Sequence, residues 1–385
     1  MKKNIQIWSK KIKKKDFKYA LISAVVLLGI VLYNFPFKKS EISYNPSNNI
    51  NDKLTMTMVG DIMMGRNITN ITNYYGSDYL FRYTYLFFEN SDYVSGNFEN
   101  TVLLDKKETY VKANKYIHLD TTKQTVNTLK KMGFTMLNLA NNHMMDFNSK
   151  GLQETLQVLQ ENKLNYVGAG NNLIDAKKIN YQNINGIKIA SLGFTDAIAP
   201  GAVATTNKAG VLSMNPDNFV EQIREAKDPK KGNADLVIVN VHWGEEYDTK
   251  VNQRQQSLAK ALVDAGADII IGHHPHVLQS FEIYKNSIIF YSLGNFIFDQ
   301  GWTRTKDSII VQYHLHNDGR ATVDIIPLQI NEGTPRPISN WINVERIQQQ
   351  LIKSTVDKNL WKKKKEIIEI NLNHQKILTH VEKRK

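Results

Sequence analysis

Short apolar runs alternate with amphipathic stretches between residues 54 and 272. The apolar runs have the length and composition of strands, whereas the stretches between them repeat their apolar positions with a helical period. Strands separated by helices pair mostly in parallel, so the pattern predicts an α/β fold. The predicted strands cover residues 54–60, 92–96, 134–139, 164–168, 187–193, 235–241 and 268–272, and the predicted helices cover residues 78–90, 121–132, 149–162, 215–227 and 252–265.

The pattern changes after residue 272, where strand-like runs follow one another through short turns. This indicates that the sheet ends in antiparallel strands and that one domain spans residues 54–330. The remaining residues, 331–385, read as a charged and mostly helical extension. Its segment "WKKKKEIIEINL" predicts either a solvated helix or a surface that docks on a membrane or a partner. The antiparallel strands are expected at 277–284, 287–293, 308–316 and 321–328.

One long apolar segment, residues 19–37, carries no charged side chain. A helix of this length can cross a hydrocarbon core about 30 Å thick. Residues 1–18 hold eight lysines, so the positive-inside rule places them in the cytoplasm as a basic tail. Residues 38–53 are polar and read as a stalk, which gives a single-pass protein of the cell membrane with an extracytoplasmic domain. A cleaved signal peptide and a buried core helix are the alternatives, but no small-residue cleavage site follows the segment.

The net charge of +12 is concentrated at the two ends of the chain, in residues 1–18 and 353–385. The part between them is close to neutral, which argues against nucleic acid as a partner. The chain has no cysteine. Disulfides, thiol nucleophiles, thiolate metal sites and a lipid anchor on cysteine are therefore excluded.

Polar side chains follow almost every predicted strand at its carboxyl end. Because the carboxyl ends of parallel strands meet at one edge of a sheet, we expect these side chains to converge. Imidazoles, carboxylates and amide oxygens suit divalent ions such as Mn, Fe, Zn or Mg, so the sequence predicts a site for one or two ions. On an extended backbone His274 and His276 share one face and His273 takes the other. The predicted ligands are Asp61, Asn97, Asn142, His242, His274 and His276.

The order of these motifs resembles that of the calcineurin-like metallophosphoesterases. The resemblance implies that one ion is held by Asn142, His242 and His274, and a second by Asp61 and His276.

The same resemblance implies two catalytic residues and shows two departures. His143 takes the place of the acid that protonates a leaving oxygen. Met63 stands where the family has a histidine ligand, and Asn97 stands where it has the bridging aspartate. Glu99, two residues further on, is the candidate catalytic carboxylate. Since a thioether is a poor ligand for hard ions, the sequence leaves open whether the chain is an enzyme.

A second resemblance covers residues 54–330. The segments "DYVSGNFENTV", "LNLANNHMMDF", "VHWGEEY", "ADIIIGHHPHVLQSFEIY" and "IIFYSLGNFIFDQGWTRT" are similar to the CapA/PgsA family of poly-γ-glutamate capsule biosynthesis proteins. The resemblance implies a metallophosphoesterase-like layered α/β sandwich with mixed sheets, preceded by one transmembrane helix. It also implies an ATP-dependent glutamate ligase subunit and a small membrane subunit as partners. The chain itself has no phosphate-binding loop, so no nucleotide cofactor is expected.

Three functions remain open from the sequence. The chain can be a complex subunit that supports synthesis, export or tethering of the anionic polymer. It can be a metal-dependent hydrolase of a phosphoester or of a γ-glutamyl amide, or a scaffold with a vestigial site. Candidate contacts to the polymer are Arg66, Glu246 and Arg304.

Overall fold

The computed structural model describes residues 15–29, 52–353 and 359–384. The chain divides into two units, Met1–Asn45 and Pro46–Lys385. Residues 15–29 of the first unit form a helix. Within the described ranges, no helix combines the length and the apolar content needed to cross a membrane. The predicted anchor, residues 19–37, continues past the described helix, and the predicted tail and stalk lie mostly outside the described residues, so all three stay predictions.

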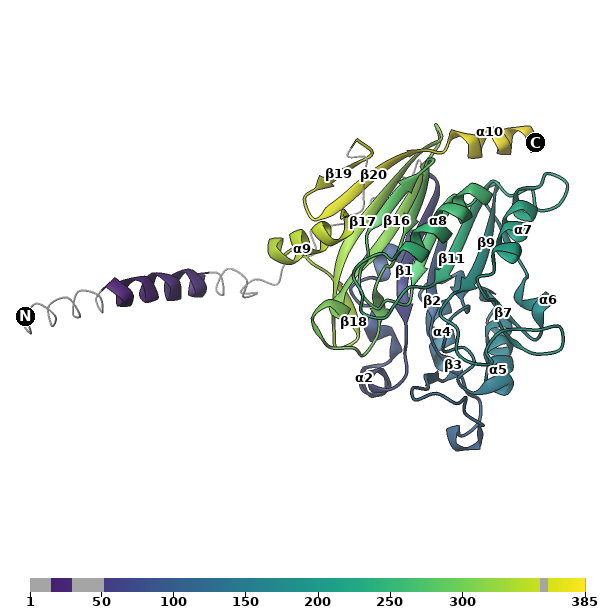
Figure 1. Ribbon diagram of the computed structural model, residues 1–385, viewed down its shortest axis with the longest axis horizontal. Helices are drawn as coiled ribbons and strands as arrows, with labels where there is room; N and C mark the ends of the chain where they lie inside the picture. The colour runs from purple at the N-terminus through teal and green to yellow at the C-terminus, as the bar shows by residue number, and fades with distance from the viewer. Residues whose placement is uncertain (1–14, 30–51, 354–358, 385) are drawn as a thin grey trace, which may run out of the picture. The chain divides into compact units, whose positions relative to one another are not determined.

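The second unit is built on a ten-stranded mixed sheet and a six-stranded mixed sheet (Figure 1). In the larger sheet β1, β2, β5 and β6 are parallel, and β16, β17, β20 and β19 extend it with antiparallel pairs. Its strands are β1 (Asp52–Ile62), β2 (Tyr93–Phe98), β5 (Met136–Asn138), β6 (Asn165–Val167), β15 (Asn295–Ile297), β16 (Asp307–His316), β17 (Arg320–Asn331), β18 (Thr334–Pro337), β19 (Trp361–Lys364) and β20 (Ile367–Asn373).

In the smaller sheet β9, β11, β12 and β14 are parallel, and an antiparallel strand closes each edge. Its strands are β8 (Asn180–Ile184), β9 (Ile187–Thr195), β11 (Leu236–His242), β12 (Ile269–His273), β13 (Phe281–Tyr284) and β14 (Ser287–Phe290). The two-stranded pairs are β3 (Thr101–Val102) with β4 (Asp120–Thr121), and β7 (Ala169–Gly170) with β10 (Gly210–Val211).

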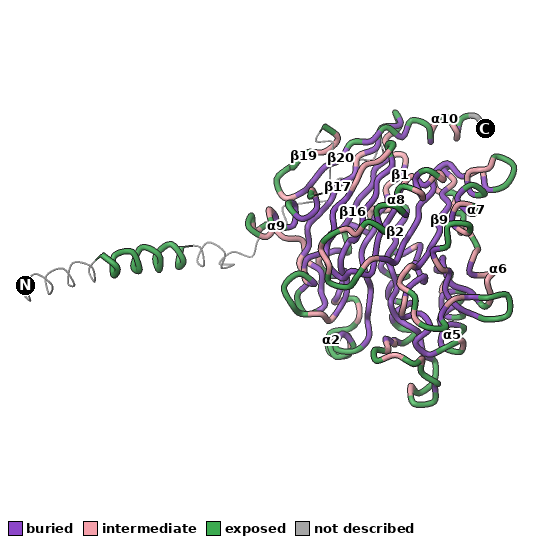
Figure 2. Tube along the Cα trace, viewed as in Figure 1, coloured by how far each residue is buried: buried purple, intermediate pink, exposed green. Residues whose placement is uncertain are grey.

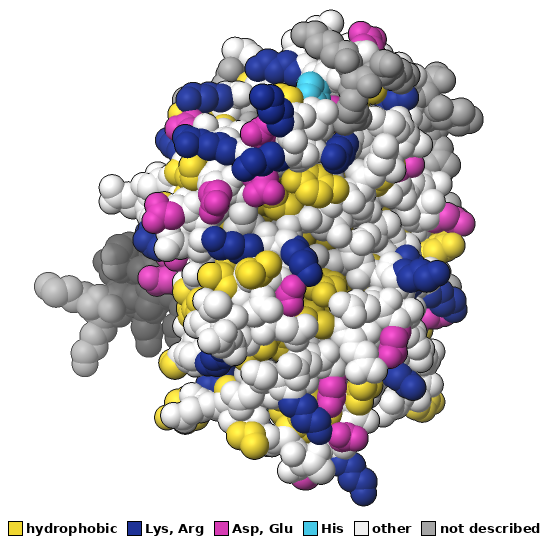
Figure 3. All heavy atoms as spheres, turned by 90° about the vertical axis from the view of Figure 1, so that its right-hand side faces the viewer, with side chains coloured by type: hydrophobic (Ala, Val, Ile, Leu, Met, Phe, Trp, Pro, Cys, Tyr) yellow, Lys and Arg dark blue, Asp and Glu magenta, His cyan; other side chains and the backbone are white. Residues whose placement is uncertain are grey.

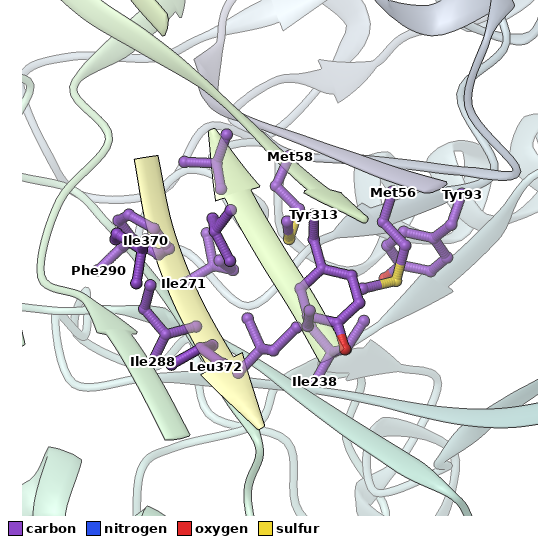
Figure 4. Close-up of a cluster of buried hydrophobic side chains, with 14 of the residues drawn as sticks. Met56, Met58, Tyr93, Ile238, Ile271, Ile288, Phe290, Tyr313, Ile370 and Leu372 are labelled. Atoms are coloured by element: carbon purple, nitrogen blue, oxygen red, sulfur yellow. The ribbon is translucent and has the colours of Figure 1, made fainter. Parts of the chain in front are cut away.

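The main core lies between the two sheets. Met56 and Tyr93 of the larger sheet belong to one buried cluster with Ile238 and Ile271 of the smaller one (Figure 4). The Tyr93 hydroxyl also reaches Ser191 Oγ of β9 at 3.1 Å, so a polar contact joins the sheets. In Figure 2 the strands are buried along most of their length and the exposed residues lie in helices and loops. The predicted layered α/β arrangement with mixed sheets is therefore confirmed.

Helices pack on the outer face of the smaller sheet. Phe219 of α7 and Leu262 of α8 contact the same cluster as Val239 of β11. The face that carries α6 and α7 bears acidic side chains interspersed among the basic ones (Figure 3). The helices are α2 (Asn67–Tyr75), α3 (Tyr85–Glu89), α4 (Lys123–Lys131), α5 (Asn148–Glu161), α6 (Leu173–Ala176), α7 (Pro216–Lys227), α8 (Gln253–Ala265), α9 (Trp341–Leu351) and α10 (Gln375–Arg384), with short 3₁₀ helices η1 (Ser77–Phe81), η2 (Lys107–Thr109) and η3 (Thr303–Lys306).

Most predicted helices are found within about two residues of their expected ends, as is usual for sequence-based boundaries. Asn252 begins α8 with a capping box, because its side chain accepts from Gln255 N and the Gln255 side chain accepts from Asn252 N. The helix predicted over residues 78–90 is wrong as one element, since η1 and α3 replace it.

The prediction of a separate helical C-terminal extension is also wrong in part. Residues 361–373 form the hairpin of β19 and β20, and β20 pairs with β17 inside the larger sheet. Ile368, Ile370 and Leu372 alternate along β20 and enter the main core, because a period of two buries one face of a strand. The domain therefore continues past residue 330.

The lysines of this hairpin are paired with acids. Lys362 Nζ lies 2.8 Å from Glu369 Oε1, and Lys364 contacts the other oxygen of the same carboxylate. Lys363 Nζ lies 2.7 Å from Glu345 Oε1 on α9. These contacts reduce the charge that the segment offers to a membrane, and they protect an edge strand from pairing with other chains.

Candidate metal centre

Strand register brings the predicted residues to one place. Asp61 of β1 lies opposite Asn97 of β2 on one side and opposite Asn295 of β15 on the other. In the smaller sheet His242 of β11 lies opposite His273 of β12. All of them are at most 1% exposed. Polar side chains from both sheets thus meet at the carboxyl ends of parallel strands, where α/β proteins place their sites.

Asn97 joins two buried carboxylates. Its Nδ2 donates to Asp61 Oδ1 at 2.8 Å and to Glu99 Oε1 at 3.0 Å. Its Oδ1 accepts from the amide nitrogens of Asn138 at 2.9 Å and Asn141 at 3.4 Å. Turning the amide over would set its nitrogen against the amide nitrogens of Asn138 and Asn141 and its oxygen against the Asp61 carboxylate. Asn97 is therefore a hydrogen-bond donor to the carboxylates, and this orientation does not fit its predicted role as a metal ligand.

His242 connects this network to Asn142. Its Nε2 lies 3.1 Å from Asn142 Oδ1 and its Nδ1 lies 3.2 Å from Asn97 Nδ2. Burial, helped by the nearby His274, lowers the pKa of His242 well below its usual value, so the ring is neutral. A neutral ring fits these contacts when Nε2 donates to Asn142 Oδ1 and Nδ1 shares one of the two Asn97 Nδ2 hydrogens with a carboxylate oxygen. The rings of His242 and His274 are 4.6 Å apart, so the three residues assigned to one ion do lie together.

The turn after β12 differs from the extended backbone expected there. His274 and His276 have φ values of 97° and 56°, in the left-handed region, so the alternation rule does not apply to them. His276 Nδ1 lies 2.9 Å from Asn295 Oδ1 and 3.3 Å from Asp61 Oδ2. His273, expected on the far face, has its Nδ1 3.4 Å from Asp61 Oδ1. The expectation that His273 faces away was wrong, because its ring and that of His276 both reach the Asp61 carboxylate.

The pKa values of the two buried carboxyl groups, Asp61 and Glu99, are shifted in opposite directions. Burial alone would raise the pKa of Asp61, but hydrogen bonds from His273 and His276 hold it well below its usual range. Burial and the charge of Asp61 raise the pKa of Glu99 well above its usual range. Burial opposes a charge on His276, yet Glu99 and Asp61 raise its pKa to about 9. Asp61 therefore keeps its negative charge and favours a proton on His276, whose Nδ1 lies 3.3 Å from Asp61 Oδ2.

Two groups of side chains in the described part of the chain can hold a metal ion. Asp61, Glu99 and His276 bring ligand atoms within 4.8 Å of one another, and so do Glu246, His274 and His276. Each group contains a buried atom that has no hydrogen-bond partner, Glu99 Oε2 in the first and His274 Nδ1 in the second. Buried polar atoms rarely stay unpaired, so these two atoms suit a ligand such as a divalent ion.

His143 sits in a network of its own. Its Nδ1 lies 2.8 Å from Asp146 Oδ2, an arrangement that fixes the tautomer and leaves Nε2 as the reactive nitrogen. Lys115 Nζ contacts Asp146 Oδ1 at 2.6 Å, His143 Nδ1 at 3.2 Å and Asn142 O at 2.8 Å. Burial lowers the pKa of His143, and Asp146 opposes that effect. Lys115 was missed by the sequence reasoning, because it comes from a loop without strand or helix periodicity.

Asn295 was missed as well, although the sequence holds a signal for it. The tripeptide Gly-Asn-Phe occurs at residues 96–98 and again at residues 294–296. The two copies lie on β2 and β15, which flank β1 on opposite sides and place an asparagine next to Asp61 from each. The repeat of this tripeptide, each time after an apolar run, could therefore have pointed to Asn295.

The remaining predicted residues lie at different distances from the site. Met63 Sδ accepts from Gly65 N at 3.2 Å and is fully buried, so it supports the loop after β1. Arg66 pairs with Asp299 at the rim. Arg304 lines a separate cavity of about 170 Å³, together with Arg346 and other residues, so the structure does not bring it into the site.

Aromatic rings form one wall beside His276. Phe298 lies 4.8 Å from its ring and Tyr247 lies 6.0 Å from it. Trp302 packs against Tyr247 at 4.7 Å and keeps 56% of its surface exposed. Burial and the charge of Glu246 raise the pKa of Tyr247 to about 12, so this hydroxyl stays protonated. The wall separates the buried carboxylates from the solvent.

The fold and the site together define a mixed α/β domain with a candidate metal centre at its strand ends. The family profile of bacterial capsule synthesis protein PGA_cap matches residues 55–300. Capsule biosynthesis protein CapA of Bacillus anthracis is 55% identical over 378 residues, which cover 98% of this chain and 92% of the relative. PGA biosynthesis protein CapA of Bacillus subtilis (strain 168) is 47% identical over 331 residues, 86% of this chain and 85% of the relative. The chain belongs to the PGA_cap family of bacterial capsule synthesis proteins.

Among solved structures, purple acid phosphatase PPD1 from yellow lupin seeds is similar to 74% of this chain and 53% of its own, with 10% identity and a TM-score of 0.33. A score at that level does not establish a shared fold, so the architecture rests on the strand order described above.

Proposed function

We propose that this chain is a membrane-anchored, extracytoplasmic subunit of a capsule-forming complex and supports synthesis, export or tethering of poly-γ-glutamate. The observation that carries the proposal is the similarity to capsule biosynthesis protein CapA over 98% of the chain. The apolar segment 19–37, with lysines on its N-terminal side, supplies the anchor and its orientation. Because the sequence has no phosphate-binding loop, the ATP-dependent ligase is a partner, as is a small membrane subunit.

The geometry also favours a second candidate function, a metal-dependent hydrolase of a phosphoester or a γ-glutamyl amide. The supporting observation is the pair of unpartnered buried atoms, Glu99 Oε2 and His274 Nδ1, within the two ligand groups. A divalent ion such as Mn, Fe, Zn or Mg held there would supply Lewis acidity toward a substrate oxygen. His143 keeps its Nδ1 hydrogen on Asp146, so its Nε2 can take a proton from an attacking water and pass it on to the leaving atom. Asn97 keeps the two carboxylates in place during this step.

The capsule role is tested in a capsule-forming host that lacks this chain. We expect the full-length chain to restore the polymer and His276→Ala to fail, because His276 belongs to both ligand groups. His380→Ala is the matched control, since this histidine of α10 contacts Asp235, which directly precedes β11 at the end opposite His242. Polymer at wild-type levels without the chain would refute the role. Protease added to intact protoplasts should digest the domain, and protection would refute the orientation.

The hydrolase candidate needs a separate measurement. The full-length chain, purified in detergent, should hold a stoichiometric divalent metal and cleave a phosphodiester or γ-glutamyl substrate, and His276→Ala should lose both. Metal without turnover would leave a binding or assembly role. Turnover that survives chelation would refute metal dependence.

A further inference from the structure

A continuous row of tyrosine rings and guanidinium groups runs along the surface from the end of α2. The rings of Tyr74 and Tyr75 are 4.5 Å apart, and those of Tyr75 and Tyr79 stack at 4.3 Å with an interplanar angle of 13°. The guanidinium of Arg82 lies 3.4 Å from the centre of the Tyr79 ring and 4.5 Å from that of Tyr83. Arg336 of β18 lies 5.0 Å from the Tyr83 ring. We name Tyr74, Tyr75, Tyr79, Arg82, Tyr83 and Arg336 the tyrosine–arginine ladder.

The backbone holds the ladder in place. Gly76 ends α2 with φ 82° and lets η1 begin at once, so Tyr75 and Tyr79 face each other. Arg82 Nη1 donates to Tyr79 O at 2.6 Å and to Thr334 Oγ1 at 3.1 Å. Thr334 belongs to β18, which pairs with β17 and lies beside α2 (Figure 1). The ladder is therefore tied to the larger sheet.

Helix α2 leads from the candidate metal centre to the ladder. Arg66, the residue before α2, pairs with Asp299 and lies 5.6 Å from the centre of the Phe298 ring. Phe298 packs on His276 with ring centres 4.8 Å apart. The nine residues of α2 span about 13 Å at the helical rise. One helix thus connects the rim of the site to the first stacked tyrosines.

The exposure of the ladder indicates a ligand. Tyr74 is 81% exposed and Tyr75 is 56% exposed, although neither ring is needed to close the core. Stacked rings offer flat surfaces to amide planes and methylene groups, and their hydroxyls and the guanidinium edges offer donors to carboxylates. The acidic neighbour Asp78 is paired with Lys131, which reduces its repulsion of an anion.

We propose that the tyrosine–arginine ladder binds an extended polyamide that carries carboxylates, poly-γ-glutamate, and directs it along α2 toward the candidate metal centre. The assignment of this polymer rests on the proposed function. Charge complementarity favours a polyanion, because the ladder carries Arg82 and Arg336 within its stacked row. The ladder has no aliphatic residue, whereas a protein interface has an apolar core within a polar rim, so a chain molecule fits the ladder better.

The test measures binding of fluorescent poly-γ-glutamate of defined length to the full-length chain in detergent. The variant combines Tyr75→Ala and Tyr79→Ala, and Arg336→Gln is measured separately. Tyr116→Ala is the matched control, because Tyr116 is exposed outside the ladder on the loop between β3 and β4. We expect the double variant to bind at least about tenfold more weakly, as the loss of stacking and cation–π contacts implies. Arg336→Gln should weaken binding and reduce its salt dependence, and the control should bind as the wild type does.

Several outcomes would overturn the inference. Equal binding by the wild type and the double variant would show that the rings do not contact the polymer. Polyacrylate, which has carboxylates but no amides, should bind more weakly than poly-γ-glutamate. Equal affinity for the two polymers would show that the ladder recognises only their negative charge. If the ladder variants bind the polymer normally but no longer co-purify with a membrane protein partner, the ladder belongs to a protein interface.

The proposed function can fail separately from this inference. Restoration of the capsule in the host tests the proposed function, whereas polymer binding to the purified chain tests the ladder. If His276→Ala abolishes the capsule and the ladder variants bind normally, the proposed function stands and the inference fails. Melting temperatures of all variants exclude misfolding as the cause.

Discussion

The replacement Asn97→Asp is the sharpest perturbation of the candidate metal centre. Asn97 Nδ2 donates to Asp61 Oδ1 at 2.8 Å and to Glu99 Oε1 at 3.0 Å, and all three residues are fully buried. An aspartate would place a further carboxylate oxygen at the same point. Its other oxygen would still accept from Asn138, so the change acts only on the side that faces the carboxylates.

The expected cost follows from these two contacts. Losing the donor to the ionised Asp61 costs about 1.5–3 kcal/mol, and losing the donor to Glu99, whose pKa is raised, costs about 1 kcal/mol. Repulsion between neighbouring carboxylates adds to this. The free energy of unfolding, measured by urea titration with a chelator present, should therefore fall by about 3 kcal/mol or more.

A divalent ion should reverse the loss, because a third carboxylate gives the site one more anionic ligand. At an ion concentration of 100 times the dissociation constant, binding to the folded state adds about 2.7 kcal/mol. Asn240→Asp is the matched control, since Asn240 is as buried on β11 and its Nδ2 lies 3.4 Å from Leu192 O. It should lose stability without recovery by the ion. If Asn97→Asp unfolds like the wild type without metal, Asn97 is not the donor described here.

Three further changes have defined outcomes. Burial lowers the pKa of His374, so the folded chain keeps the ring neutral while the unfolded chain takes up a proton near pH about 6.5. The neutral ring therefore stabilises the folded chain above that pH, and this contribution is lost as the pH falls toward the pKa of His374 in the folded chain. His374→Gln should flatten the dependence of the free energy of unfolding on pH, measured by urea titration. Parallel curves for the wild type and the variant would contradict this. A Cβ on Gly60 would lie 1.9 Å from Gly294 O, so Gly60→Ala should lower the free energy of unfolding by about 1–3 kcal/mol or more, whereas Gly301→Ala, with no heavy atom within 4 Å, should not change it. Removal of residues 359–384 takes β19, β20 and α10 from the fold and should yield aggregated protein, and a soluble product with a cooperative melt would show that the domain ends earlier.

The arrangement of strands and helices could be predicted because apolar periodicity reports which face of each element is buried. Strand-end reasoning also brought Asp61, His242 and His274 together from distant parts of the sequence. It failed at 361–373, where a run of lysines and a charged flank suggested a solvated helix. The alternation of Ile368 and Ile370 was present there, but only the partner strand β17 gives those residues a core to enter.

The roles of single side chains were less predictable, because they depend on partners that periodicity does not reveal. Asn97 looks like a metal ligand until Asn138 and Asn141 fix the direction of its amide. A strand that continued past His273 would turn this side chain away from the site. The positive φ of His274 shows that the extended backbone ends at His273. Both errors concern the orientation of side chains at strand ends that the structure brings together.

The orientation of Asn97 also limits where an ion can lie. Its Nδ2 occupies the space between Asp61 Oδ1 and Glu99 Oε1, so those two oxygens are already satisfied. Within the two ligand groups that include His276, Glu99 Oε2 and His274 Nδ1 are buried and have no hydrogen-bond partner. Glu99 in one group and His274 with Glu246 in the other would therefore be the residues that hold an ion, and of these only Glu246 is exposed. Arg66, which precedes α2, lies 5.6 Å from the Phe298 ring beside His276, so a substrate that follows α2 from the tyrosine–arginine ladder would arrive next to these residues.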